Sequence, residues 1–393
     1  MRNRWGILAV LFVVRATMAF QFQSVAAVAP LLGGQFGVSI ADIGVLIGLY
    51  FAPGIVFALP GGAIGQKFGD KRTVLGALLL MLAGSVVMAY ATLWNVQIAG
   101  RLLAGIGGVI LSVQLTKMVT DWFAGKEIAT AMAILVNSWP AGIAVSLLVL
   151  PSIGTSTGLG AVHLAVAAFI VFGVALLALF YRPPSDAPAA STAAVARLDR
   201  SAAFAVIVAG LIWGLFNIGF AVIFSFGPSM LVERGWSIAS AGSAISIVLW
   251  IAVFSVPFGG WLADRTGRPQ TILVVASLVS ALLMVLLPRT GAVIATVIAL
   301  GLIGGQPAGP IMSLPARVLL PASRAIGMGL FFTMFYGCMM LGPVVGGALA
   351  KWTGSAAAAF DFGAAMILVC PVLLLGFNWI ASGAAARRAI APT

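Results

Sequence analysis

Two arginines lie inside long apolar stretches of the sequence, where a charged side chain is unfavourable. Arg15 stands about ten residues into the first stretch, which corresponds to ~15 Å along a helix. Arg101 has a similar setting in a later stretch. An ionisable group at such a depth costs at least ~2.5 kcal/mol on insertion scales, so each arginine should face a cavity or a partner.

None of the nine acidic residues offers that partner, because all of them fall in predicted loops or at the ends of apolar stretches. Unmatched guanidinium groups create a positive potential, and their planar donors suit a carboxylate or a similar planar ion. We therefore predict a site for a small anionic substrate, with Arg15 as the principal charge ligand and Arg101 as the second. Two alternatives stay open: Arg15 packed against helix carbonyl groups, and a structural role for Arg101.

Further polar and aromatic side chains at moderate depth could complete this site, although such residues more often form interhelical hydrogen bonds or simply pack. The additional substrate-binding candidates are Phe22, Asn137, Trp139, Asn217, Trp250, Gln306 and Tyr336.

The elements that position these residues must be membrane-spanning helices. Of the 393 residues, 62% are hydrophobic and only 8% are charged, whereas a soluble domain carries about 25% charged residues. Strands are not expected, because an open sheet edge cannot be satisfied in lipid. Apolar runs between charged or Gly/Pro-rich breaks predict twelve helices over residues 5–32, 41–63, 72–92, 94–118, 127–150, 160–181, 202–227, 238–262, 270–288, 291–312, 324–350 and 360–382.

Positive charge is distributed unequally over the loops between these helices. With a cytoplasmic N-terminus, the inside segments carry sixteen Lys and Arg residues and the outside loops carry three. Cytoplasmic loops of membrane proteins collect these residues. We therefore expect a multi-pass protein of a lipid bilayer, the bacterial inner membrane, with both termini in the cytoplasm. Residues 5–32 are interpreted as a retained first span, because Arg15 interrupts a stretch too long for a signal peptide core.

The two halves of the chain repeat one loop pattern. A polar, proline-rich segment over residues 182–201 is predicted to be a cytoplasmic linker between an N-terminal half, 1–181, and a C-terminal half, 202–393. The loops after the second and eighth spans align when Gln66 is matched to Asp264, 198 residues later. The predicted fold is an all-α membrane protein with two six-helix bundles related by a pseudo-twofold axis. Such duplication is typical of transporters, with the substrate between the repeats.

Both loops resemble the signature of the major facilitator superfamily, G-x-x-x-D-[RK]-x-G-[RK]-[RK]. The loop after the eighth span matches it at Asp264, Arg265, Gly267 and Arg268. The loop after the second span fits it at Lys67 and Gly69 and has Arg72 in its basic end, but it has Gln66 where the family has aspartate. In the family this aspartate helps to latch the two halves on the cytoplasmic side, and a carboxylate is favourable at a helix N-terminus. The resemblance implies that these loop residues control the conformation, with a weaker latch at Gln66.

Weaker similarities concern individual spans. The segment 100–107 resembles the family's fourth-span arginine motif, and the segment 137–142 is similar to the cyanate-permease-like branch. Gly-Pro-x-x-Gly-Gly, which drug:proton antiporters carry in span five, stands here in span eleven, over residues 342–347. We expect a secondary active transporter that moves an organic carboxylate or a cyanate- or nitrate-like ion by alternating access. The alternatives are a proton-coupled drug or multidrug exporter and, less favoured, a receptor on the same fold.

The sequence contains no motif that indicates enzymatic or cofactor chemistry. There is no phosphate-binding loop or Ser/His/Asp set, so we expect neither an enzyme nor a catalytic residue, and no cofactor. The two cysteines, Cys338 and Cys370, lie in apolar stretches and indicate neither disulfide nor metal site. The net charge of +12 is dispersed, which argues against nucleic acid. Transport could be coupled to a proton carried with the substrate or to a counter-anion, and we expect a monomer.

Overall fold

The computed structural model describes residues 3–123, 127–182, 199–319 and 323–390, with side chains except at 58–63, 66, 128–130, 133, 324–325 and 383–390. Every regular element in these ranges is helical. The elements are α1 (Arg4–Ala27), α2 (Ala29–Phe36), α3 (Ile40–Leu49), α4 (Ala52–Phe68), α5 (Asp70–Ala89), α6 (Trp94–Phe123), α7 (Ile128–Thr157), α8 (Leu159–Phe180), α9 (Arg200–Glu233), α10 (Ile238–Thr266), α11 (Pro269–Leu286), α12 (Val293–Gly304), α13 (Ala308–Ser313), the 3-10 helix η1 (Leu314–Arg317), α14 (Arg324–Thr353) and α15 (Ala357–Ile390).

Twelve stretches of these helices are long and apolar enough to cross a membrane, which confirms the predicted span count. The predicted continuity of three spans was wrong. The first is divided between α1 and α2, the second between α3 and α4, and the tenth between α12 and α13. Proline explains these breaks: α2 and α4 have one within their first two positions, and Pro307 directly precedes α13. Proline lacks the backbone N–H that a continuous helix requires, and it suits the first helical turn.

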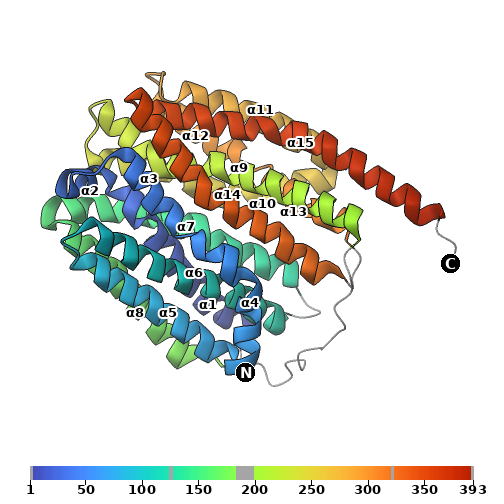
Figure 1. The fold of residues 1–393 in the computed structure, drawn as a ribbon, viewed down its shortest axis with the longest axis horizontal. Coiled ribbons are helices and arrows are strands. Elements are labelled where there is room, and N and C mark those ends of the chain that lie inside the picture. Colours follow the sequence, from blue (N-terminus) through green and yellow to red (C-terminus); the bar gives the residue numbers. More distant parts are fainter. Residues whose placement is uncertain (1–2, 124–126, 183–198, 320–322, 391–393) are drawn as a thin grey trace.

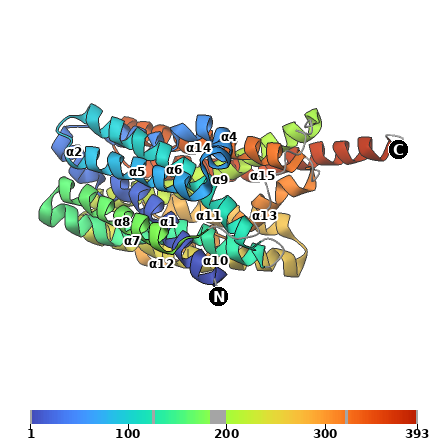
Figure 2. The ribbon, with the colours of Figure 1, turned by 90° about the horizontal axis from the view of Figure 1, so that it is seen from below.

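The helices form two bundles that run side by side along the long axis (Figures 1 and 2). In the first bundle, α1 packs on α7 and α8, and α5 packs on α6 and α8. In the second, α9 packs on α14 and α15, while α10 packs on α12. The predicted linker 182–201 falls largely outside the described residues, so the structure describes the bundles that flank it.

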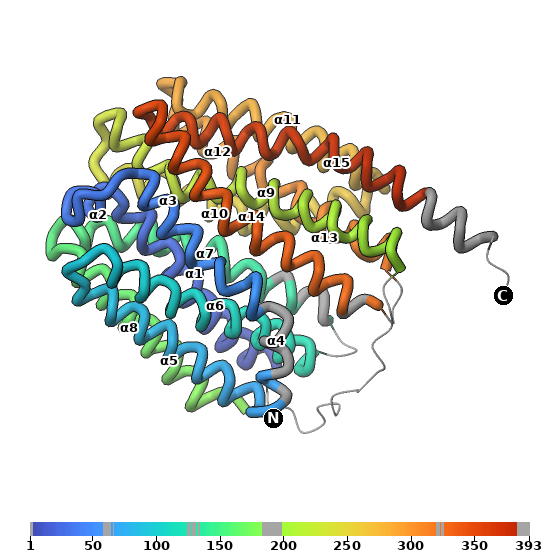
Figure 3. The backbone as a smooth tube through the Cα atoms, in the orientation of Figure 1, coloured from blue at the N-terminus to red at the C-terminus, as the bar shows by residue number. Residues whose placement is uncertain are grey.

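The bundles meet at the end that carries α2 and diverge toward the end that carries both termini (Figure 3). At the joined end, α3 packs on α14 and α7 packs on α10. Glycines permit this approach. A Cβ atom on Gly44 or Gly48 would overlap a carbonyl oxygen of α14, and one on Gly242 would overlap the carbonyl oxygen of Leu147. Small residues at helix interfaces allow such backbone contact. The arrangement is therefore closed at one end.

Candidate substrate-binding site

Arg15 lies half-buried in the middle of α1, and its guanidinium is only partly satisfied by the protein. The Nη1 atom donates a hydrogen bond to the carbonyl oxygen of Leu135 in α7, at 3.0 Å. The Nε atom is buried without a hydrogen-bond partner. The ion pairs among the described side chains do not include Arg15. Arg15 thus keeps unused donor capacity in the middle of α1.

Tyr336 brings the second bundle to this position. Its phenol, on α14, lies close enough to interact electrostatically with Arg15, and it lies near Ser112 of α6. The ring also packs against α4, because a Cβ atom on Gly54 would meet it at 2.5 Å. Arg15 and Tyr336, both predicted site residues, therefore lie together where the two bundles meet.

Arg101 has a different environment. Its side chain is fully buried, and its Nε, Nη1 and Nη2 atoms donate to the carbonyl oxygens of Leu46, Gln21 and Phe22 at 3.0, 3.1 and 2.8 Å. The guanidinium carbon also lies 4.6 Å from the ring centroid of Tyr50. The prediction of Arg101 as a second charge ligand is not supported in this conformation, because every nitrogen is engaged. The geometry favours the structural alternative.

The break in the second span explains why Arg101 is held in this way. α3 ends at Leu49, and the N–H of Tyr50 turns back to the carbonyl groups of Ile47 and Gly48. The carbonyl of Leu46 is therefore one of the groups that a helix C-terminus leaves without an intrahelical donor. Arg101 supplies that donor and simultaneously binds two carbonyls of α1, so it fastens α6 to α1 and α3.

Aromatic rings from both bundles form a connected group near these residues. We define the aromatic cluster as Phe22, Phe51, Trp139, Trp213, Phe224, Phe335 and Tyr336. Phe22 contacts Phe51 and Trp139 with ring centroids 4.9 and 5.3 Å apart. Phe51 reaches Tyr336 at 6.2 Å, and Phe22 reaches Phe224 in α9 at 6.1 Å. Phe22 is fully buried, whereas Trp139, which follows Leu135 by one turn, is half-buried.

The remaining candidates do not all join this group. Asn137 is half-buried and donates to the carbonyl oxygen of Val253 in α10 at 3.2 Å, which links the bundles. Asn217 donates to a carbonyl group one turn earlier in α9 at 2.7 Å. Gln306, in the turn between α12 and α13, donates to the carbonyl oxygen of Leu302 in α12 at 3.0 Å. Trp250 is 41% exposed on α10. No contact described for Gln306 or Trp250 connects either of them to Arg15.

Three residues important to this region were missed or undervalued by sequence reasoning. Gln21 bonds Met81 and Ser85 of α5 through Nε2, both at 2.7 Å, and accepts a weak hydrogen bond from Tyr50. Gln23 donates to the carbonyl oxygen of Phe224 at 2.6 Å and crosses between the bundles. The available signal was the presence of two polar amide side chains inside a predicted span, but the sequence does not show in which direction these side chains point. Phe51 carried no signal, because the break beside it was not predicted.

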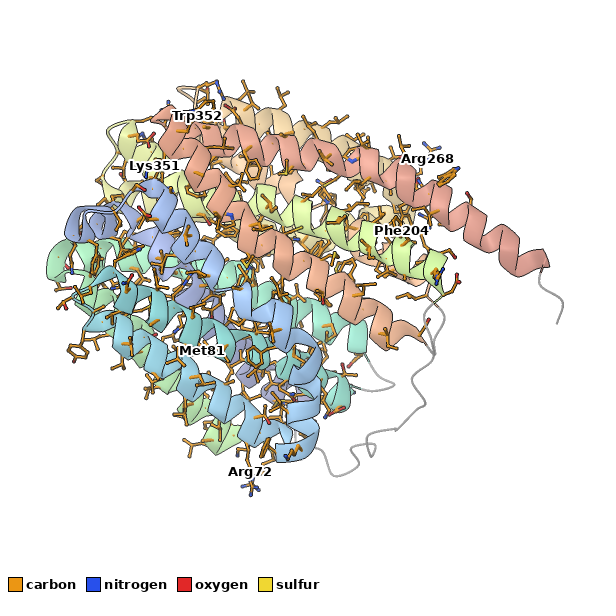
Figure 4. The ribbon with its side chains drawn as sticks, in the orientation of Figure 1. Arg72, Met81, Phe204, Arg268, Lys351 and Trp352 are labelled. Atoms are coloured by element: carbon orange, nitrogen blue, oxygen red, sulfur yellow. The ribbon has the colours of Figure 1, made fainter. Side chains whose placement is uncertain are left out.

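The two loops predicted to control the conformation, which we call the gating loops, lie at the divergent end, one on each bundle. Arg72 and Arg268 are exposed and well separated (Figure 4). Gly69 and Gly267 have φ values of +81° and +64°, which glycine adopts without strain. The aromatic contacts of Lys67 and Arg265 are local, with Phe68 and Trp261. Asp264 is exposed, and the side chain of Gln66 lies outside the described residues.

Comparison with known proteins identifies the family. A model described as Major Facilitator Superfamily matches residues 11–337 and 202–389. The chain belongs to the Major Facilitator Superfamily. The superfamily resemblance of the two loops is thereby confirmed, and solved structures agree on the fold. The xylose transporter XylE from E. coli, in an inward open conformation, superposes with a TM-score of 0.79 at 11% identity, covering 95% of this chain and 96% of that chain. A bacterial homologue of the lysosomal transporter Spinster gives 0.73 at 16% identity, covering 98% and 97%.

Three transport proteins are similar to parts of this chain in sequence. The inner membrane transport protein YajR of Escherichia coli is 31% identical over 36% of this chain and 30% of its own length. A human choline/ethanolamine transporter is 25% identical over 70% of this chain and 57% of its own length. The hexuronate transporter of Bacillus subtilis is 24% identical over 60% of this chain and 58% of its own length. The matches thus span less than two thirds of these relatives.

Proposed function

We propose that this superfamily member is a secondary transporter that moves a small organic anion by alternating access, with Arg15 as the charge ligand. The observation that carries the proposal is the half-buried guanidinium of Arg15, which makes one hydrogen bond to protein and keeps a buried Nε without a partner. A charge at this depth is unfavourable unless a ligand or water completes it. A carboxylate would supply both the opposite charge and the missing acceptors.

The surroundings of Arg15 favour a carboxylate that carries an apolar or ring-shaped body. Tyr336 offers a hydroxyl next to the guanidinium, and Trp139 and Phe335 of the aromatic cluster are half-buried rather than fully packed. Ligand sites combine such an apolar lining with a few placed polar groups. The name of the hexuronate transporter, a relative, supports a carboxylate substrate as well.

A second candidate function is the transport of an organic cation, as in the proton-coupled drug exporter considered above. The aromatic cluster supports it, because aromatic faces attract cations. A relative named as a choline/ethanolamine transporter supports it too. Arg15 opposes it, since a like charge would stand at the site. The anion is therefore the favoured substrate class.

The closed end formed by α3 with α14 and α7 with α10 supports an inward-facing state. The positive charge of the predicted loops supports a cytoplasmic position for the divergent end, with both termini. An inward open conformation of the structurally similar xylose transporter is in line with this assignment. In alternating access, the opposite state would open α3 from α14 and bring the two gating loops together.

The test uses matched pairs of charged and neutral probes with purified protein in liposomes. Benzoate is compared with benzyl alcohol, glucuronate with glucose, and choline serves as the cation. We expect binding and uptake of a carboxylate but not of its neutral partner. Arg15→Gln should weaken carboxylate binding by about 100-fold, because it removes a bidentate charge-assisted interaction of roughly 3 kcal/mol. Arg15→Lys should give an intermediate loss, since lysine keeps the charge without the planar fork.

Arg289→Gln is the control, because this arginine is exposed in the loop between α11 and α12 and pairs with Asp361. Carboxylate binding that is equal in wild type and Arg15→Gln would contradict the proposed ligand. Energy-dependent extrusion of choline or a cationic dye, unaffected by Arg15→Gln, would favour the second candidate instead.

A further inference from the structure

A cavity of about 420 Å³ opens at the divergent end of the second bundle, away from Arg15. It lies between the loop that ends α10, the first turn of α11, and α13 with η1. We name it the α11 pocket. Its volume lies in the range of small-molecule sites, ~300–1,000 Å³. Arg268, which borders it, lies at the edge of the bundle in Figure 4.

Two arginines, Arg268 and Arg317, line the α11 pocket, and none of its ten lining residues is acidic. The ion pairs within the described part of the chain include neither arginine. The pocket thus concentrates two positive charges that have no ion-pair partner among the described side chains. A concave site lined by one sign of charge raises the local concentration of the opposite ion.

Arg317 is held in place before any ligand arrives. Its Nη1 atom donates to Oδ1 of Asn378 at 3.0 Å, and its guanidinium carbon lies 5.2 Å from the ring centroid of Phe377. Asn378 is fixed in turn by a reciprocal amide pair with Gln270, at 3.0 and 3.2 Å. A side chain that is already ordered loses less entropy when it binds.

The other donors at the α11 pocket favour an ion with several acceptor oxygens. The N–H groups of Gln270 and Thr271 belong to the first turn of α11, where a helix has no internal acceptors for them. Thr271 adds a hydroxyl group. A tetrahedral phosphate can accept from two guanidinium groups and from such donors at once, whereas a carboxylate has only two oxygens.

We propose that the α11 pocket binds a phosphate group, supplied either by the headgroup of an anionic phospholipid or by free phosphate. Basic pockets between membrane helices on the cytoplasmic side suit anionic headgroups. The site is separate from Arg15, so the proposal holds whether or not the transported substrate is an anion.

The test has two arms with the full-length protein. In the first, the protein is placed in phosphatidylcholine nanodiscs that contain phosphatidylglycerol, and the phosphatidylglycerol retained after release is counted by native mass spectrometry. In the second, phosphatidylcholine nanodiscs without anionic lipid are titrated with inorganic phosphate, and the melting temperature is followed at constant ionic strength. Arg317→Gln, Arg268→Gln and the double variant are compared with wild type.

We expect each single variant to weaken binding about fivefold and the double variant about 30-fold, from roughly 1 kcal/mol per arginine. Arg200→Gln is the matched control, because Arg200 is exposed at the same end and does not line the pocket. A response in the first arm alone identifies a lipid headgroup, and a response in the second alone identifies free phosphate. Equal melting temperatures in pure phosphatidylcholine check that the variants fold. The absence of a response in both arms, or equal binding by Arg317→Gln and Arg200→Gln, overturns the proposal.

Discussion

Replacing Arg101 by methionine should destabilise the protein while leaving the anion site intact. The three hydrogen bonds from Arg101 to carbonyl oxygens come from a charged donor. Hydrogen bonds of this kind are worth about 1.5–3 kcal/mol each, which gives a gross loss of roughly 5–9 kcal/mol. Methionine also relieves the desolvation penalty of a buried ion, several kcal/mol in real proteins. The net loss that we expect is about 2–4 kcal/mol.

The carbonyl of Leu46 determines why the net effect of Arg101→Met on stability is a loss. The carbonyls of Gln21 and Phe22 lie within α1, where helical N–H donors remain, but α3 ends just after Leu46. Methionine leaves that oxygen buried without its donor, and an unsatisfied buried polar group costs about 1–3 kcal/mol. The loss therefore exceeds what the relieved desolvation returns.

The assay is thermal unfolding of purified protein in detergent, followed by carboxylate titration of the protein that remains folded. Arg101→Met should lower the melting temperature by several degrees, at a few degrees per kcal/mol, with unchanged carboxylate affinity. Arg15→Met is the matched comparison: it loses a single hydrogen bond, so we expect little change in melting temperature and a large loss of affinity. Arg101→Met with a wild-type melting temperature and no carboxylate binding would refute the assignment of these two roles.

Three further changes test two conformational elements and one exposed ion pair. Gln66→Asp restores the family's carboxylate at the gating loop and should favour the state closed at the divergent end, measured by spin-label distances; an unaltered distance distribution removes the latch argument. Gly48→Val places side-chain atoms against the carbonyl of Met340 and should open the joined end. A cysteine introduced at that end should therefore react faster with a thiol label. Asp361→Asn removes the partner whose hydrogen bonds raise the pKa of Arg289. Because both side chains are nearly half exposed, the free energy of unfolding should change by less than about 1 kcal/mol.

The number of spans could be predicted because it depends on the length of apolar runs alone. The breaks within spans could not, because proline has opposite outcomes in this chain. Pro53 lies in the first turn of a new helix, whereas Pro140 and Pro343 lie inside continuous helices. In membrane helices, packed neighbours can satisfy the carbonyl that proline leaves free. Whether they do so depends on tertiary contacts, which no local pattern contains.

The same limitation applies to the two arginines. The position of each in an apolar stretch could be predicted from the sequence, but the direction of each side chain could not. The direction of Arg101 became clear only with the break after Leu49, because the freed carbonyl of Leu46 is what it binds. The unpaired Nε of Arg15 likewise depends on α7 offering it a single carbonyl.

The bonds inside the first bundle differ in kind from those between the bundles. Arg101, Gln21 and Tyr50 connect α1, α3, α5 and α6 through several buried hydrogen bonds, some from a charged donor. Gln23 and Asn137 each cross to the other bundle through one neutral bond, and a neutral hydrogen bond contributes only about 0.5–1.5 kcal/mol. The first bundle should therefore move as a unit, while the joined end separates at small cost. Gln23→Ala should then accelerate thiol labelling at the joined end without lowering the melting temperature as Arg101→Met does, and an equal loss of stability in both variants would contradict this division.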